Sequence, residues 1–193
     1  MRIDRLVVAS KNADKLREIE AVLLGLGLVN HIVADLDWPD VEETEPTLKE
    51  NALLKARAVA AATGLPALAD DTGLEVDALG GAPGARSARY AGESASYADN
   101  VRVLLEDLAG VKDRSARFRT VMALVMPGGQ EIVAEGVLEG SIIETPRGDS
   151  GFGYDPVFDV DGRTLAQLAA VEKNTISHRG RALRDLAEML RRM

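Results

Sequence analysis

Apolar residues occur along the chain in short runs, which are typical of strands, and at the spacing of amphipathic helices. The run at residues 6–9 predicts a buried strand. Five apolar residues at helical spacing predict the helix that follows: Leu16, Ile19, Val22, Leu23 and Leu26. Gly25 and Gly27 break this pattern and are expected to end the helix. The chain therefore opens with a strand and a helix.

The same alternation continues in the next part of the chain. A short apolar segment at residues 32–34 predicts a second strand, and an irregular acidic stretch follows at residues 35–45. Thr47 and Glu50 have the spacing of a capping box, so a helix is expected to begin there. This helix should end near residue 63, because a glycine follows.

Two aspartates follow the next predicted strand. Residues 66–69 predict a short strand, which delivers Asp70 and Asp71 to its carboxyl end, where ligands of α/β sheets bind. Residues 80–84 then predict a tight irregular loop, and residues 96–109 predict another helix.

The last part of the chain predicts a long hairpin and a final helix. Residues 117–126 and 131–143 are rich in strand formers, and Pro127-Gly128-Gly129 separates them. The final helix is expected to start near residue 177, with three leucines on one face: Leu183, Leu186 and Leu190. The fold class is therefore α/β, with a mixed sheet and flanking helices.

Composition bounds the size and the partners of the protein. The 193 residues are 46% apolar, which suffices for one sizeable core or two small lobes, and the absence of repeats or linkers predicts a single domain over 1–193. The formal charge of −8 argues against a nucleic-acid partner, because such a protein needs a basic face. An acidic protein can still bind a triphosphate if its cations gather in one place with a divalent metal.

Cysteine and the N-terminus exclude further classes. With no cysteine, disulfides, thiolate catalysis and Cys-based zinc sites are excluded. The apolar run after Arg2 and Arg5 has only about four residues, far fewer than a signal sequence or membrane span needs. We therefore expect a cytoplasmic protein without a membrane partner.

The segment Ser10-Lys11-Asn12-Ala13-Asp14-Lys15 leaves the first strand and enters the first helix. A helix N-terminus offers unpaired N–H groups and partial positive charge, and Ser10, Asn12 and Lys15 add a hydroxyl, an amide and a cation. The segment therefore predicts a phosphate site. The alternative is that Ser and Asn only cap the helix.

Four further segments carry residue types suited to triphosphate chemistry: Glu42-Glu43, Asp70-Asp71-Thr72-Gly73, Gly151-Phe152-Gly153-Tyr154-Asp155-Pro156 and Lys173 to Arg179. With these segments the chain resembles the inosine triphosphate pyrophosphatase family (RdgB-like enzymes) over nearly its whole length. The resemblance implies an elongated, two-lobed molecule with a central cleft, and a homodimer. It also implies magnesium-dependent hydrolysis of ITP, dITP and XTP to the monophosphate and pyrophosphate, which removes them from the nucleotide pool.

The resemblance also implies roles at the phosphate end of the substrate. Asp71 is the catalytic acid/base residue and a magnesium ligand, and Glu43 is the second metal carboxylate, with Glu42 as a register alternative. Thr72 lies against the substrate, and its hydroxyl stands where serine is more usual. Three lysines are expected to contact phosphates: Lys15, Lys55 and Lys173. Isolated, each of these residues is also explained by a turn, a solvated loop or an exposed helix face.

At the base end, Phe152, Gly153, Tyr154 and Asp155 are implied to form one wall, with the Phe152 ring stacked on the purine. Core filling and a turn role for Asp155 are the alternatives. His178 and Arg179 are candidates for reading the 6-oxo group, since donors there match a carbonyl and face the amino group of adenine unfavourably. For isolated residues, the alternative that they are helix-capping or surface groups would be favoured.

Two other functions remain open at this point. One is a related pyrophosphatase for pyrimidine or modified nucleotides, because the phosphate residues do not define the base. The other is a nucleotide-binding protein without turnover. A P-loop ATPase is disfavoured because the N-terminal segment lacks the Gly-x-x-x-x-Gly-Lys pattern.

Overall fold

A computed structural model describes residues 2–34 and 36–193, so Asp35 of the predicted acidic stretch lies outside the described residues. The α-helices are α1 (Ala13–Leu26), α2 (Leu48–Thr63), α3 (Tyr97–Asp107), α4 (Ala170–Ile176) and α5 (His178–Arg192). The strands are β1 (Ile3–Val8), β2 (Val29–Val33), β3 (Ala67–Val76), β4 (Pro83–Gly84), β5 (Ser115–Val125), β6 (Glu131–Ile142), β7 (Phe158–Val160) and β8 (Arg163–Thr164). Short 3₁₀ turns lie at Asp77–Leu79, Ser87–Arg89 and Leu165–Gln167.

The sheet is mixed, which confirms the predicted fold class. Its strand order is β2-β1-β3-β5-β6-β7-β8, and β4 pairs with β3. Strand β1 runs parallel to β2 and to β3, with Val8 opposite Leu68. The pairs β3–β4, β6–β7 and β7–β8 are antiparallel.

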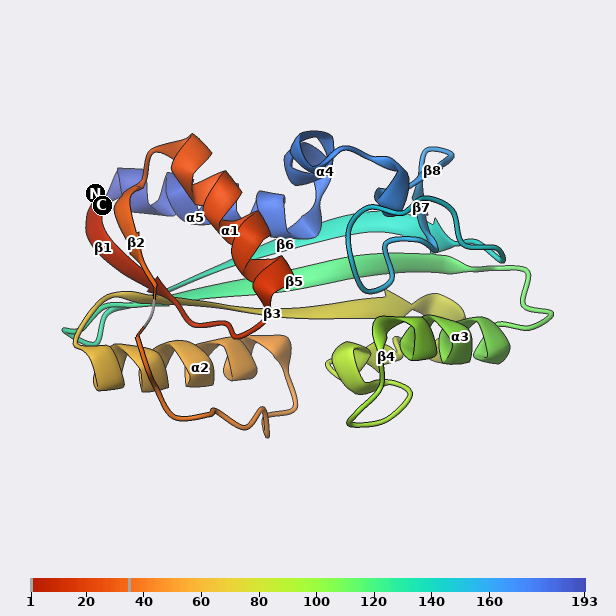
Figure 1. The fold of residues 1–193 in the computed structure, drawn as a ribbon, viewed down its shortest axis with the longest axis horizontal. Coiled ribbons are helices and arrows are strands. Elements are labelled where there is room, and N and C mark those ends of the chain that lie inside the picture. Colours follow the sequence, from red (N-terminus) through yellow and green to blue (C-terminus); the bar gives the residue numbers. More distant parts are fainter. Residues whose placement is uncertain (1, 35) are drawn as a thin grey trace. The chain divides into compact units, whose positions relative to one another are not determined.

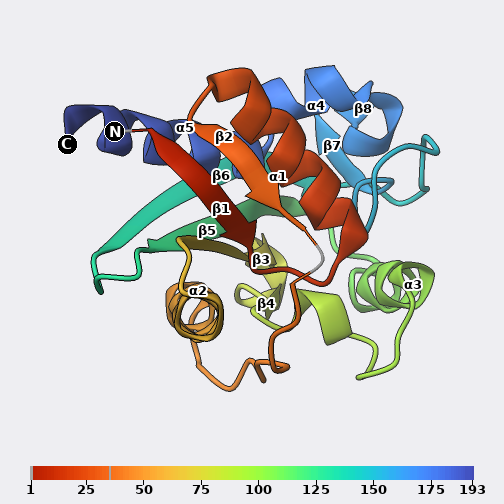
Figure 2. The same ribbon diagram turned by 60° about the vertical axis from the view of Figure 1, so that its left-hand side comes forward.

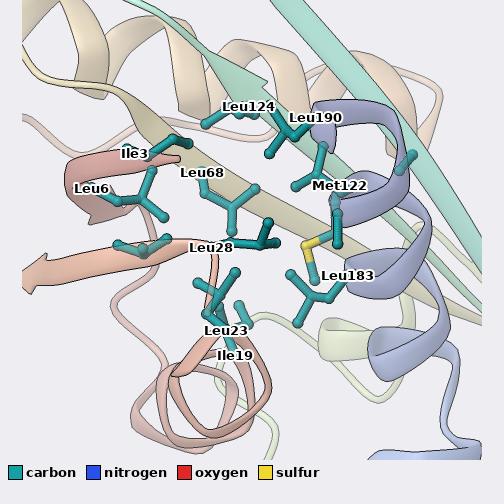
Figure 3. Packing of buried hydrophobic residues seen from close by; sticks show 14 of the residues in the cluster. Ile3, Leu6, Ile19, Leu23, Leu28, Leu68, Met122, Leu124, Leu183 and Leu190 are labelled. Carbon is teal, nitrogen blue, oxygen red and sulfur yellow. The ribbon is translucent and has the colours of Figure 1, made fainter. Parts of the chain in front are cut away.

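The chain divides into two compact units, of which unit 1 holds residues up to 71, 120–136 and 178–193. In this unit, α1 and α5 lie on one face of the strands and α2 lies on the other (Figures 1 and 2). The core between α1, α5 and the strands is aliphatic (Figure 3). Its labelled side chains include Ile19 and Leu23 of α1, Leu183 of α5, and Leu68 and Met122 of the strands. These are the residues that helical and strand spacing place inward.

Unit 2 holds residues 72–119 and 137–177 and has a hydrophobic core of its own. Leu104 and Leu108, from α3 and its C-terminal end, pack there with residues of the strands. The rings of Phe118 and Phe158 meet with centroids 4.6 Å apart. Both rings belong to this core, together with the buried ring of Tyr154. The expected single domain with a central cleft stays a prediction.

Most predicted elements are present with bounds shifted by a few residues. The hairpin of β5 and β6 is confirmed, with a turn in which the Gly129 N–H donates to the Met126 carbonyl at 2.8 Å. The predicted end of the first helix is confirmed: α1 includes Gly25 and ends at Leu26. Gly27 is the C-cap, at φ 62°, a left-handed conformation that favours glycine.

The predicted strand at residues 66–69 is too short, since β3 extends from Ala67 to Val76. Its first part pairs with β1, which ends at Val8, and its later part pairs with β4. Asp70 and Asp71 therefore lie inside a long strand, directly after the point where its parallel neighbour ends. The two aspartates therefore lie at the carboxyl end of β1, the edge at which ligands of α/β sheets bind.

Candidate active site

Lys55 gathers two carboxylates at the end of the parallel strands in unit 1. Its Nζ lies 2.6 Å from Glu43 Oε1 and 3.4 Å from Asp71 Oδ1, and it donates to the Asp70 carbonyl at 2.6 Å. Helix α2 carries Lys55, β3 carries the aspartates, and the loop before α2 carries Glu43. Glu42 is exposed, so Glu43 is the member of that pair that reaches the cluster.

Asp71 has the environment of a basic carboxylate. Burial raises its pKa, and the charge of Glu43 adds to this, while Lys55 partly offsets it. Its Oδ2 atom is buried and has no hydrogen-bond partner among the described residues. An acceptor of this kind, in an oxygen-rich site, fits a hard cation such as Mg²⁺.

The protein supplies only part of a metal site. Within residues 2–34 and 36–193, no three His, Asp or Glu side chains form a group able to hold an ion. Glu43 and Asp71 would provide two oxygen ligands, and Mg²⁺ commonly keeps several waters and takes further ligands from substrate phosphates. The residues present therefore fit the implied metal.

Asp70 is also buried, but it differs from Asp71 in its ion pairs. Its carboxylate is 1% exposed, and both Lys15 Nζ and Arg179 Nη2 lie 3.1 Å from its Oδ2 atom. Burial acts to raise the pKa of Asp70, but the charges of Lys15 and Arg179 outweigh it and hold the pKa below its ordinary value. Asp70 is therefore a fixed anion that orients two cations.

Arg179 is buried and pairs with a second carboxylate, the partly buried Glu18 of α1, which accepts a hydrogen bond from Nη1. The first turn of α5 approaches β6 closely, because a Cβ at Gly136 would lie 2.1 Å from the carbonyl oxygen of His178. His178 itself is 3% exposed. Ion pairs with Glu18 and Asp70 hold the Arg179 side chain in unit 1. The roles expected for Arg179 and His178 in reading the 6-oxo group stay predictions.

The loop before α1 is built as a helix cap. The Asn12 side chain accepts hydrogen bonds from the N–H groups of Asp14 and Lys15, at 2.9 and 3.3 Å, and Ser10 Oγ accepts from the Asn12 N–H at 3.3 Å. The capping alternative therefore holds for Asn12, and Ala13 is the first helical residue. The phosphate role of this loop rests on Lys15, whose side chain is 20% exposed at the cluster.

Two residues of the same segment make contacts at the surface. Lys11 pairs with Asp40, and Asp14 pairs with Arg17 one turn along the helix. Pairs this exposed contribute little to stability and leave the Lys11 ammonium accessible. The substrate-binding roles expected for Lys11 and Asp14 stay predictions.

In unit 2, Asp155 organises the glycine-rich loop. Its Oδ2 accepts hydrogen bonds from the Phe152 N–H, at 2.8 Å, and from Lys173 Nζ. A Cβ at Gly151, where φ is 74°, would lie 2.1 Å from the same oxygen. Asp155 is 2% exposed, and its hydrogen bond with the Phe152 N–H closes a turn. The structure therefore shows the turn role that was the alternative for Asp155.

The ring of Phe152 is flanked by a cation and by an aromatic residue. Lys173 Nζ lies 4.9 Å from the ring centroid, and the Tyr97 ring lies 5.8 Å away at 42°. The phosphate contact expected for Lys173 stays a prediction, because its ammonium is here paired with Asp155. Gly153, at φ 63°, provides a left-handed turn next to the ring.

Tyr154 and the part of β3 that follows Thr72 belong to one hydrogen-bonded region of unit 2. Tyr154 is buried, and its hydroxyl donates to the Ser87 carbonyl at 2.9 Å, so its ring fills the core beside the loop. The Ser87 hydroxyl accepts from the Leu74 N–H at 2.8 Å. Gly73 lies against the loop of Gly84, whose carbonyl oxygen would be 2.7 Å from an added Cβ. These contacts fix the positions of the residues of β3 that follow Thr72.

The Ham1 family profile matches residues 6–189 of the chain. The chain belongs to the Ham1 family. A relative from Streptomyces avermitilis, named dITP/XTP pyrophosphatase, is 50% identical over 196 residues, covering 98% of each protein. A protein of the same name from Symbiobacterium thermophilum is 52% identical over 189 residues, covering 96% of this chain and 94% of the relative.

Solved structures agree with this membership. A HAM1 protein from Coxiella burnetii superposes with a TM-score of 0.88 at 45% identity, covering 99% of this chain and 100% of the other. A nucleoside-triphosphatase / dITP/XTP pyrophosphatase from Mycobacterium abscessus superposes with a TM-score of 0.75 at 44% identity, covering 96% and 99%. The mixed α/β architecture is therefore that of the Ham1 family.

Sequence reasoning about this Ham1 protein assigned no role to Asp70 and missed Glu18 and Tyr97. Glu18 lies three positions after Lys15, on the same helix face, so helical periodicity could have found it. No sequence signal could have found Tyr97, because its contact with Phe152 joins segments far apart in the chain. In the described part of the chain, no helix combines the length and apolar character needed to cross a bilayer.

Proposed function

We propose that the protein is a magnesium-dependent nucleoside triphosphate pyrophosphatase. It hydrolyses the non-canonical purine nucleotides ITP, dITP and XTP, and water and the triphosphate yield the nucleoside monophosphate and pyrophosphate. Membership of the Ham1 family and the names of relatives about 50% identical over the full length support this reaction.

The contrast between Asp70 and Asp71 carries the assignment of roles. Two adjacent carboxylates have pKa values shifted in opposite directions, one below and one above the ordinary value. Such a pair separates a permanent anion from a proton acceptor. Asp71 is therefore assigned as the general base, which takes a proton from the attacking water, and Asp70 holds the cations beside it.

Glu43 and Asp71 are assigned as the carboxylates that hold Mg²⁺. When bound, the ion supplies positive charge that neutralises the triphosphate and aligns it for displacement. Lys55 lies between the two carboxylates, so it keeps them at one location before the ion arrives.

The cations of the site are assigned to the phosphates. Lys15 and Lys55 lie in unit 1 with their ammonium groups close to Asp70 and Asp71. Negative phosphate oxygens can share these ammonium groups with the carboxylates, because each ammonium has three donor hydrogens. Lys173 and Arg179 are assigned as further sources of positive charge for the triphosphate.

The glycine-flanked Phe152 is assigned to the base. Asp155 and Gly151 fix its backbone, and Lys173 lies over its ring, so the ring is held in a defined orientation. Stacking of an aromatic ring on a base contributes about 1–3 kcal/mol. His178 and Arg179 are assigned to the 6-oxo group of hypoxanthine and xanthine.

The partner in this proposal is the nucleotide, and the protein acts as a homodimer in the cytoplasm without nucleic acid or membrane. A pyrimidine-directed pyrophosphatase and a binding protein without turnover are the alternatives. Glu43 and Asp71 disfavour the second, because a binding protein has no need of a basic carboxylate beside the phosphates.

Hydrolysis of ITP in ¹⁸O-labelled water tests the reaction. Attack at the α-phosphorus places the label in IMP, and we expect IMP with one ¹⁸O and unlabelled pyrophosphate. Label in pyrophosphate would place the attack at the β-phosphorus, and IDP with labelled inorganic phosphate would replace the pyrophosphatase by a phosphohydrolase. A matched reaction with Asp71→Asn controls for contaminating activity.

A further inference from the structure

Asn51 is a buried polar residue of α2 that the roles above do not use. It is 1% exposed, and its side-chain amide forms two hydrogen bonds with the backbone of Glu45. Oδ1 accepts from the Glu45 N–H at 3.0 Å, and Nδ2 donates to the Glu45 carbonyl at 3.1 Å. Two bonds of opposite sense to one residue fix both the position and the orientation of its peptide groups.

Asn51 lies one helical turn before Lys55, so the two side chains emerge on the same face of α2. Lys55 contacts the Glu43 side chain at 2.6 Å, while Asn51 contacts the Glu45 backbone. Residues 43–45 belong to no helix or strand. The segment is therefore attached to one helix face at two points, two residues apart.

We infer that Asn51 is a positioning residue for the metal carboxylate Glu43. This inference rests on the role proposed for Glu43. Mg²⁺ demands near-ideal octahedral geometry with short oxygen distances, so Glu43 and Asp71 must be placed together before it binds well. Lys55 attracts the Glu43 carboxylate, and Asn51 fixes the backbone two residues further along, at Glu45. Loss of the amide leaves the charge attraction in place but releases the backbone.

Asn100 provides a matched control in unit 2. It is 2% exposed, accepts from the Ala91 N–H at 2.8 Å and donates to the Ala88 carbonyl at 3.0 Å. It therefore makes the same two-sided contact between a helix and a loop. No residue that we assign to the metal lies on that loop.

The test is a titration of the full-length protein with Mn²⁺ in the absence of nucleotide. Electron paramagnetic resonance measures the concentration of free Mn²⁺ at each step. We expect Asn51→Ala to raise the dissociation constant about 10- to 100-fold, the effect usual for residues that orient metal ligands. The Mg²⁺ concentration for half-maximal ITP turnover should rise with it, while turnover at saturating Mg²⁺ stays near that of the unmodified protein. Hydrogen exchange at the Glu45 amide should accelerate.

Asn51→Asp is the second variant, because it keeps the size of the side chain if the alanine variant does not fold. It retains the acceptor for the Glu45 N–H but faces the Glu45 carbonyl with an oxygen, so metal binding should again weaken. Asn100→Ala should lower the stability and leave the Mn²⁺ affinity unchanged. Equal weakening by Asn100→Ala would make the effect one of general stability and overturn the inference.

Glu43→Gln separates this inference from the proposed function. If Glu43→Gln weakens Mn²⁺ binding and both Asn51 variants bind normally, the positioning role is wrong and the metal carboxylate stands. If Glu43→Gln binds Mn²⁺ normally, the proposed role of Glu43 is wrong and the inference falls with it.

Discussion

Arg179 and Asp70 form a buried ion pair of 3.1 Å although 109 positions separate them in the chain. The pair connects the first turn of α5 to β3, and neither side chain is more than 2% exposed. A buried charge that loses its partner is costly, because the low-dielectric interior does not solvate it. The same ion pair therefore stabilises unit 1 and fixes the position of the Asp70 carboxylate, which also binds Lys15.

Arg179→Met tests that coupling. Removal of one partner from a buried ion pair costs about 3–5 kcal/mol, so the free energy of unfolding in urea should fall by that order. Glu106→Gln is the control, because the Arg102–Glu106 pair on α3 is exposed and its loss should leave the unfolding free energy essentially unchanged. Equal effects of the two substitutions would contradict the structural role of the buried pair.

The pH dependence of stability should identify Asp70. Its pKa in the folded protein is lowered, so its ionised form stabilises the fold above the ordinary pKa of about 3.9 and this contribution is lost as the pH falls below it. We expect Asp70→Asn to be less stable than the unmodified protein by a constant amount above about pH 5. The difference should shrink in more acidic solution.

Chemical unfolding from about pH 3 to neutral pH, with a chelator present, measures this difference on both sides of the ordinary pKa. A difference that grows as the pH falls would require a raised pKa at Asp70 and would contradict the ion pairs with Lys15 and Arg179.

Asp71→Asn should separate activity from stability. Loss of a general base lowers turnover about 10²- to 10⁴-fold. Burial raises the pKa of Asp71, so the folded protein disfavours its charge, and a neutral side chain should maintain or increase the free energy of unfolding. Steady-state kinetics and urea unfolding on the same preparation check both parts, and near-normal turnover in a folded variant would exclude Asp71 as the base.

The sequence predicted the order of most elements because apolar spacing records which faces are buried. It underestimated β3, since Asp70, Asp71 and Thr72 before Gly73 have the composition of a turn. The neighbouring strands extend this segment instead, because pairing with β4 continues after β1 has ended. Such tertiary effects override local preference and leave no signal in the segment itself.

The candidate site was predicted by residue type and by family resemblance, while its contacts were not. Glu43, Lys55 and Asp71 were expected near the phosphates, and the structure brings these three together. The pairing of Arg179 with Glu18 joins α5 to α1. It could not be predicted, because the spacing of residues shows which side chains share a helix face but not which helix packs against that face.

Phe152→Ala should weaken recognition of the base. Stacking worth about 1–3 kcal/mol corresponds to a rise in KM for ITP of roughly five- to 150-fold, with a smaller change in kcat. Phe152→Tyr keeps an aromatic ring and should retain the KM of the unmodified protein. If the alanine variant binds ITP as well as the tyrosine variant does, the ring fills space only and takes no part in the base site.

The most direct measurement is product analysis of the purified protein with Mg²⁺ and ITP, dITP, XTP, GTP, ATP or dTTP in parallel, using ion-exchange separation of the products. We predict conversion of ITP, dITP and XTP to monophosphate and pyrophosphate, little turnover of the other three nucleotides, and a large loss of activity in Asp71→Asn. Preferred turnover of dTTP or ATP would contradict the assignment to non-canonical purines, and absence of turnover with every nucleotide would contradict catalysis itself.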